Sequence, residues 1–147
     1  MADNRYGRTL LSEHGLRCTT PRLAVLEVLD RSRHAGHLTA AEIHRRLDDE
    51  GRRIDLTTVY RTVSTLVRNQ VLHTLIIDER VVSVGLADRP HHHAICNRCA
   101  TVTEVPAAAL SEAVAYASAG SNFLLPNTAA LTLHGLCPRC QRELRPN

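Results

Sequence analysis

The sequence has 147 residues, of which 44% are hydrophobic, so it is long enough for one ordinary domain or two small ones with a packed core. No apolar run approaches the ~18 residues of a membrane span, and the N-terminal stretch MADNRYGR lacks the apolar centre of a signal peptide. We therefore expect a soluble, cytoplasmic protein with no membrane partner. The net charge of +3 is too small to indicate nucleic-acid binding by itself.

The first part of the chain has the pattern of three helices. Residues 18–32 open with threonines and Pro21, which favour a helix start. In residues 38–51, Thr39 and Glu42 have the spacing of a capping box, and Gly51 is a stop signal. Residues 55–70 predict a third helix with one apolar face and one polar face. The apolar face contains Leu56, Val59, Val63, Leu66 and Val67, and the polar face contains Thr58, Arg61, Thr62 and Thr65.

The hydrophobic period changes after the third helix. The β-branched runs VLHTLII and RVVSV, separated by Asp78 and Glu79, predict a hairpin. Three helices and a hairpin make a winged helix-turn-helix domain. The stretch GLADRP mixes Gly, Pro and charge and predicts a linker. Beyond it, two strands, the helix AAALSEAVAYASAG and a returning strand NTAALTLHGLC predict a small α/β domain. The fold class is therefore α+β, with a winged-helix domain over residues 1–85 and a second domain over residues 86–147.

Two C-x-x-C pairs are the strongest motif: Cys96 with Cys99, and Cys137 with Cys140. Disulfides are unfavourable in a reducing compartment, whereas two such pairs supply the four thiolates that tetrahedral zinc takes. A thioredoxin-like redox pair is the alternative for either motif, but it would not explain the other one. We predict a closed structural Zn²⁺ site that stabilises the fold and does no chemistry. The fifth cysteine, Cys18, is an ordinary thiol or, alternatively, a redox switch.

Three histidines precede the first cysteine pair in HHHAICNRC, residues 91–99. Side chains alternate along a strand, so His91 and His93 share one face and His92 takes the other. An H-x-H pair on a surface strand is more often solvated than bound to metal, and the pattern alone leaves both interpretations open. Five other histidines have no informative spacing and are treated as structural or exposed: His14, His34, His44, His73 and His134.

The chain contains five longer motifs in order: GLRCTTPRLAVLEVL, HLTAAEIHRRL, LTTVYRTVSTL, DRPHHHAICNRC and GLCPRC. This combination, which covers nearly the whole chain, resembles the ferric-uptake-regulator (Fur) family of bacterial metal-dependent transcriptional repressors. The resemblance implies a homodimer that binds palindromic, double-stranded operator DNA through the winged helix. It also implies that the second domain holds the zinc site and mediates dimerisation, and that a regulatory divalent metal binds between the two domains.

The resemblance assigns the regulatory metal to His37, His91, His93 and Glu104. Four ligands suit tetrahedral Zn²⁺ better than five- or six-coordinate Fe²⁺ or Mn²⁺, so zinc is slightly favoured. Many relatives take a further acidic or thiol ligand from the end of the wing, where this chain has only Val84 and Gly85. One ion held by both domains would set the spacing of the two recognition helices in a dimer.

The resemblance also suggests where DNA is bound. Tyr60 and Arg61 match the family's base-reading pair on the third helix, and Thr58 at the start of that helix is also assigned to the DNA contact. An arginine there can pair with guanine, and an aromatic edge can contact a thymine methyl group. Arg17 would reach the minor groove. Arg22 is expected to contact a phosphate, with a packing role as the alternative.

Two other functions fit parts of the pattern. A zinc enzyme would use the histidines and Glu104 around an open metal position, but no cluster in the sequence offers a base beside them, so we expect no catalytic activity. A winged-helix repressor that binds DNA regardless of metal is the second alternative, and it is favoured by Val84 and Gly85 at the wing.

Overall fold

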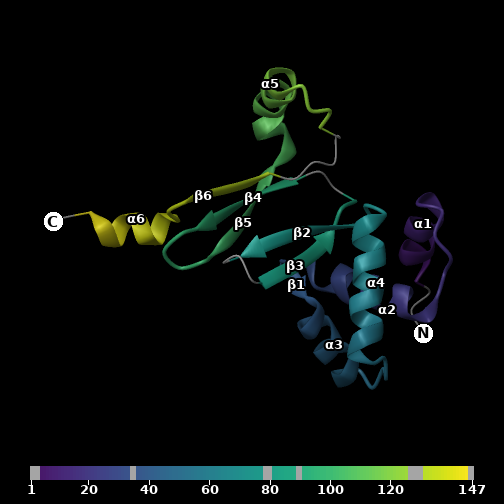
Figure 1. Ribbon diagram of the computed structural model, residues 1–147. Helices are drawn as coiled ribbons and strands as arrows, with labels where there is room; N and C mark the ends of the chain where they lie inside the picture. The colour runs from purple at the N-terminus through teal and green to yellow at the C-terminus, as the bar shows by residue number, and fades with distance from the viewer. Residues whose placement is uncertain (1–3, 34–35, 78–80, 89–90, 126–130, 146–147) are drawn as a thin grey trace. The chain divides into compact units, whose positions relative to one another are not determined.

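The structure is a computed structural model that describes residues 4–33, 36–77, 81–88, 91–125 and 131–145 (Figure 1). The chain forms two compact units, Met1–Asp88 and Arg89–Asn147. Asp78 and Glu79 of the expected hairpin turn lie outside the described residues, as does His34.

The first unit combines helices with a small antiparallel sheet. Its described helices are α1 (Arg5–Glu13), α2 (Thr20–Arg31), α3 (Ala40–Asp49) and α4 (Leu56–Arg68). Its strands are β1 (Leu38–Thr39), β2 (Leu72–Ile77) and β3 (Val81–Leu86), arranged in the order β1-β3-β2. The expected hairpin is confirmed as β2 and β3, and β1 adds a short third strand beside β3.

Local signals in the sequence explain where α3 begins and ends. The Thr39 hydroxyl accepts a hydrogen bond from the Glu42 amide at 3.1 Å, and the Glu42 carboxylate accepts one from the Thr39 amide at 2.7 Å. Gly51 follows the helix with φ +74°, a conformation that glycine adopts without steric cost. The predicted capping box and stop are confirmed.

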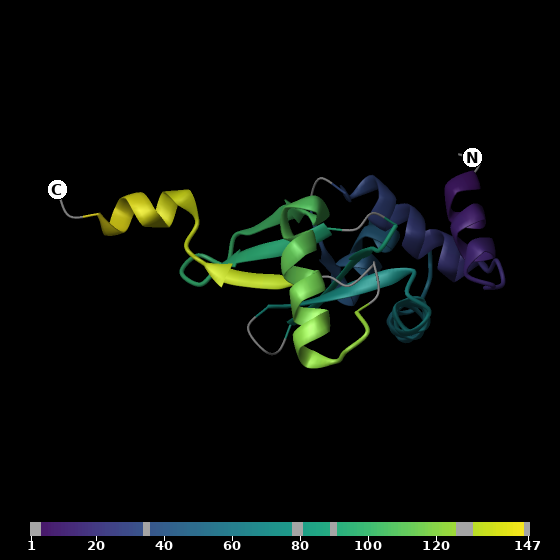
Figure 2. The same cartoon turned by 90° about the horizontal axis from the view of Figure 1, so that it is seen from above.

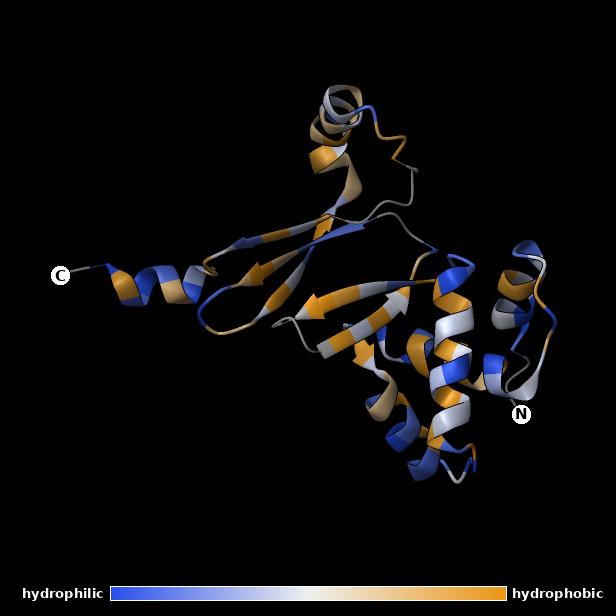
Figure 3. Cartoon of the chain, in the orientation of Figure 1, coloured by the Kyte–Doolittle hydropathy of each residue, from blue (hydrophilic) through white to orange (hydrophobic). Residues whose placement is uncertain are grey.

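Helix α4 packs one face against the aliphatic core of the first unit. Figure 3 shows hydrophobic and hydrophilic positions alternating along this helix. Two assignments to its faces were wrong. Leu56 is 40% exposed because it is the first residue of the helix, whereas Thr62 is buried. Thr62 follows Val59 by three residues and precedes Leu66 by four, so it lies on the same buried stripe.

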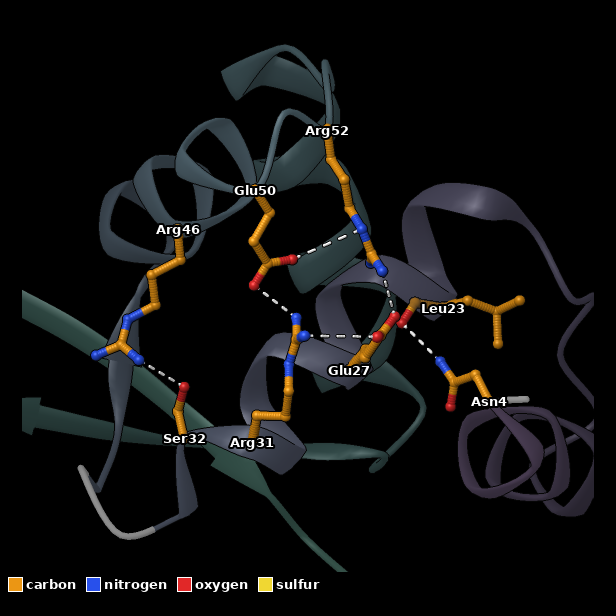
Figure 4. A network of polar contacts seen from close by, with 8 residues as sticks. All are labelled: Asn4, Leu23, Glu27, Arg31, Ser32, Arg46, Glu50 and Arg52. Carbon is orange, nitrogen blue, oxygen red and sulfur yellow. Dashed lines mark hydrogen bonds and ion pairs between the residues drawn. The ribbon is translucent and has the colours of Figure 1, made fainter. Parts of the chain in front are cut away.

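Helix α1 precedes the three helices that the sequence predicted and was not expected. The Asn4 side chain caps it by accepting a hydrogen bond from the Gly7 amide at 2.9 Å, and it donates another to the Leu23 carbonyl at 3.1 Å (Figure 4). Leu10 and Leu11 of this helix are buried in the common core. The helix is therefore an integral part of the first unit.

Ion pairs join α2 to the end of α3 (Figure 4). Arg52 donates to Glu27 at 2.7 Å, and Arg31 donates to Glu50 at 2.6 Å. Their side chains are between 19% and 51% exposed, so each pair contributes about 1 kcal/mol or less. Together they hold α2 and the C-terminus of α3 in one arrangement.

The second unit is built on a mixed sheet. Its strands are β4 (His91–Cys96), β5 (Val102–Pro106) and β6 (Thr132–Gly135), in the order β5-β4-β6. Strand β4 pairs with β5 antiparallel and with β6 parallel. Its helices are η2 (Ala107–Leu110), α5 (Ser111–Ser121) and α6 (Pro138–Leu144). Figure 2 shows α6 continuing beyond the end of β6. The expected strands are present as β4, β5 and β6, and residues 127–130 of the last one lie outside the described part of the chain. The expected helix is present as η2 and α5. Helix α6 was not expected, and Gly85 and Leu86 of the expected linker belong to β3.

Helix α5 is a short apolar helix that buries none of its residues within one chain. Tyr116 is 85% exposed, and Phe123 and Leu124 just after the helix are 71% and 95% exposed. No helix in the described part of the chain has the length and apolar character needed to cross a bilayer.

Candidate functional site

Four cysteines converge at one end of the β5-β4-β6 sheet. Cys96 ends β4 and Cys99 follows in the turn, while Cys137 caps α6 and Cys140 lies in its first turn. Their sulfur atoms all lie within 4.8 Å of one another, and those of Cys99 and Cys137 are 3.7 Å apart. A tetrahedral site with Zn–S bonds of about 2.3 Å separates its sulfurs by about 3.8 Å. The cluster therefore fits one zinc ion with no open position.

The electrostatics of the cluster also suit a cation. Hydrogen bonds from the backbone amides of Cys137 and Cys99 lower the pKa of the Cys96 thiol to about 6. Burial raises the pKa of the Cys140 thiol to about 12. A bound Zn²⁺ offsets this desolvation, because its charge deprotonates a coordinating thiol.

Strand β4 presents its histidines on two faces. The rings of His91 and His93 lie on one face with their centroids 4.7 Å apart. His92 is buried on the other face, where its Nδ1 accepts a hydrogen bond from the Leu131 amide at 3.0 Å. Glu104 stands opposite His93 in the β4–β5 register, and its Oε1 is 3.9 Å from Nε2 of His91. The two histidines and the carboxylate therefore share one face of the sheet.

His93 is held in the form that binds metal. Burial, with a smaller contribution from the neighbouring His91, lowers the pKa of His93 to about 4. The imidazole is therefore neutral near pH 7, with a lone pair for coordination. Glu104 differs, because its side chain is 66% exposed.

His37 of the first unit lies directly before β1. The pairing Leu38↔Val84 places it beside Gly85 when the register is continued by one residue, and Gly85 in turn pairs with His73 of β2. The Nε2 atoms of His37 and His73 are in direct contact, and their ring centroids are 4.6 Å apart. His73 had been treated as structural or exposed, and it is the neighbour of His37 that the sequence analysis missed. Its only sequence signal is its position on β2, two residues before the buried Leu75.

The expected DNA-contacting residues lie mostly on exposed surface of the first unit. On α4, Tyr60 is 53% exposed and Arg61 is also exposed, as is Arg17 before α2. Thr58 is engaged at the start of the helix, where its amide and hydroxyl both donate to Asp55 at 2.9 and 2.7 Å. Arg22 donates to the Arg17 carbonyl at 2.8 Å, so in this structure it supports the backbone of the segment before α2.

Comparison with known proteins agrees with this arrangement. The ferric uptake regulator family model matches residues 13–133. The chain is 31% identical to the ferric uptake regulation protein of Synechococcus elongatus over 136 residues, which cover 91% of this chain and 92% of the relative. It is 33% identical to the protein of the same name from Bordetella parapertussis over 133 residues, or 90% and 94% of the two chains. The structure of the ferric uptake regulator from Pseudomonas aeruginosa with manganese is similar, with a TM-score of 0.75, 26% identity, and coverage of 90% of this chain and 98% of that one.

The match covers most of the first unit and the larger part of the second, including Cys96 and Cys99. The family resemblance and the α+β fold class inferred from the sequence are thereby confirmed. The protein belongs to the ferric uptake regulator family, whose members are transcription regulators of metal homeostasis.

Proposed function

We propose that this protein is a metal-responsive repressor that binds palindromic operator DNA as a homodimer. In this proposal the four cysteines hold a structural zinc ion. A second divalent ion is regulatory and binds His37 of the first unit together with His91, His93 and Glu104 of the second. The proposal is carried by one observation above all, that two imidazoles of β4 and a carboxylate of β5 lie on one face of the sheet.

Dimerisation is supported by the exposed apolar side chains of α5 and the segment after it. Tyr116, Phe123 and Leu124 are each more than 70% exposed in the single chain. Apolar surface of this kind on a protein with an ordinary core marks a contact with another protein. A second copy of the chain is the partner expected for a regulator of a palindromic operator.

DNA binding is assigned to α4, with Tyr60 and Arg61 reading bases and Thr58 supporting the start of the helix. Arg17 would reach the minor groove, and Arg22 would contact a backbone phosphate. The two recognition helices of a dimer must match half-sites about 34 Å apart. An ion bound by both units would restrict the angle between them and favour that spacing. A coupling free energy of about 1–3 kcal/mol between metal and operator corresponds to a change of about 5- to 150-fold in affinity.

Zinc is the regulatory metal that we favour. Three imidazoles and one carboxylate suit a borderline divalent ion of the Zn²⁺ type. Mn²⁺ prefers a site built mainly of oxygen donors. Zn²⁺ should therefore activate DNA binding at lower free concentration than Mn²⁺ does.

The test combines metal analysis with DNA binding. A duplex enriched from a random-sequence pool in the presence of Zn²⁺ serves as the operator. Elemental analysis should find two metals per chain, one of which mild chelation removes, and chelation should weaken operator binding until metal is restored. His37→Ala should abolish this metal dependence while the structural zinc is retained. Metal-dependent operator binding by His37→Ala at wild-type strength would refute the bridging role.

A metal-insensitive DNA-binding protein is the second candidate, because Val84 and Gly85 supply no ligand from the wing. It predicts one zinc per chain and operator affinity that does not change on mild chelation. The same two measurements therefore separate the candidates.

A further inference from the structure

At the end of the wing, where many relatives have a metal ligand, this chain has Gly85. The neighbouring strand β2 carries His73 at the paired position. Building on the proposed function, we infer that His73 is an additional ligand of the regulatory ion. His37, Gly85 and His73 then form a two-imidazole clip within the first unit. Such a clip favours a nitrogen-preferring ion of the Zn²⁺ type over Mn²⁺.

The three residues form one row across the sheet. The strand order is β1-β3-β2, so Gly85 lies on the central strand, with His73 on one side and His37, directly before β1, on the other. Neighbouring strands are about 4.8 Å apart, so the backbones of the two outer residues in such a row are about 10 Å apart across the sheet. A side chain on the central residue would normally fill the space between them.

Glycine leaves that space open. A Cβ atom at position 85 would lie 2.7 Å from Nε2 of His37 and 2.9 Å from its Cδ2. The His37 ring therefore lies over Gly85 and extends toward β2. There its Nε2 meets Nε2 of His73, with the two rings inclined at 63° to each other. The end of the wing at Gly85 thus supplies no ligand, and the same glycine leaves room for His37 to meet His73 of β2.

The chemistry of the pair fits a cation. Each neutral imidazole that carries its proton on Nδ1 has a lone pair on Nε2, and a metal ion between the rings accepts both lone pairs. A single shared proton would also join the rings and is the purely structural alternative. An imidazole in place of an acidic wing ligand changes the donor set from oxygen to nitrogen. Nitrogen donors suit Zn²⁺, Ni²⁺ and Cu²⁺, whereas oxygen donors suit Mn²⁺.

The test uses full-length protein with its four-cysteine site filled with zinc. Co²⁺ binding is followed by visible absorption, which reports the number and type of its ligands, and Zn²⁺ and Mn²⁺ affinities are measured by competition. His73→Ala should lower Zn²⁺ affinity by at least roughly tenfold and alter the Co²⁺ spectrum. His44→Ala is the matched control, because His44 lies on α3 of the same unit, with Nε2 3.9 Å from Asp48. It should leave both measurements unchanged.

A second substitution separates coordination from folding. His73→Asp replaces a nitrogen donor by an oxygen donor, and it should retain metal binding while raising Mn²⁺ affinity relative to Zn²⁺. Neither a structural hydrogen bond nor a misfolded variant predicts this shift. A wild-type Co²⁺ spectrum and wild-type Zn²⁺ affinity in His73→Ala would overturn the assignment of His73.

His37→Ala and His91→Ala distinguish this inference from the proposed function. If both lose the regulatory metal while His73→Ala keeps it, the bridging ion stands and only the role of His73 is refuted. If all three bind metal as the wild type does, the regulatory site itself is refuted. Urea unfolding of every variant verifies that the first unit remains folded.

Discussion

Replacing Gly85 by alanine should separate metal binding from folding. The new Cβ would lie 2.7 Å from Nε2 of His37, and ordinary contact begins at about 3.4 Å, so the ring must retreat by about 0.7 Å. Metal–ligand distances must hold to within roughly 0.2 Å of their usual values. The displaced imidazole would therefore no longer coordinate an ion, and the contact between His37 and His73 would be lost.

The fold should tolerate this change. Gly85 is a strand residue whose φ lies outside the left-handed region, so alanine adopts the same backbone. A compatible glycine-to-alanine change stabilises a protein by about 0.4–1 kcal/mol, and forcing a ring off its rotamer costs about 0.5–1.5 kcal/mol. The two effects oppose each other, and the free energy of unfolding should change by less than about 1 kcal/mol.

Competition with a chelator of known affinity measures the effect on the regulatory metal, and urea unfolding measures the effect on the fold. Zn²⁺ affinity should fall by at least roughly tenfold. Gly135→Ala is the matched control, since Gly135 lies on β6 and a Cβ there has no neighbour within 4 Å. If Gly85→Ala binds Zn²⁺ as tightly as the wild type does, His37 is not held over Gly85 for coordination.

Three further predictions concern the caps and the cysteine cluster. Thr39→Ala removes half of the α3 capping box and should lower the free energy of unfolding by about 1 kcal/mol in urea titrations; an unchanged value would show that the box contributes nothing. Asp55 caps α4, and hydrogen bonds from the hydroxyl and the amide of Thr58 lower the pKa of its carboxyl group. The charged carboxylate therefore stabilises the helix at neutral pH, and this stabilisation is lost as the pH falls through the lowered pKa. Asp55→Ala should therefore be less stable than the wild type at pH 7, with the difference shrinking toward pH 3, and a constant difference would contradict the carboxylate's role. Cys137→Ser should lose the tightly bound zinc found by elemental analysis and unfold the second unit, as judged by protease resistance, whereas zinc retention would contradict a four-thiolate site.

Local patterns in the sequence were sufficient for several elements. Thr39 with Glu42 marked the start of α3, and the alternating runs on either side of the turn marked β2 and β3. These signals are local because caps and strand faces depend on residues a few positions apart. Helices α1 and α6 were missed because they have only nine and seven residues, too few for a hydrophobic period to be distinctive.

The sequence by itself determined the chemistry that is available to this protein: four cysteines in two C-x-x-C pairs and an H-x-H strand, in motifs typical of one family. Only the tertiary structure decided which donors meet. His37, Gly85 and His73 are separated by 12 to 48 positions in the chain, and they form one row because of the register of three strands. The register is set because the apolar faces of the strands are buried against α2, α3 and α4. This packing involves the whole unit, so no short stretch of sequence reveals it.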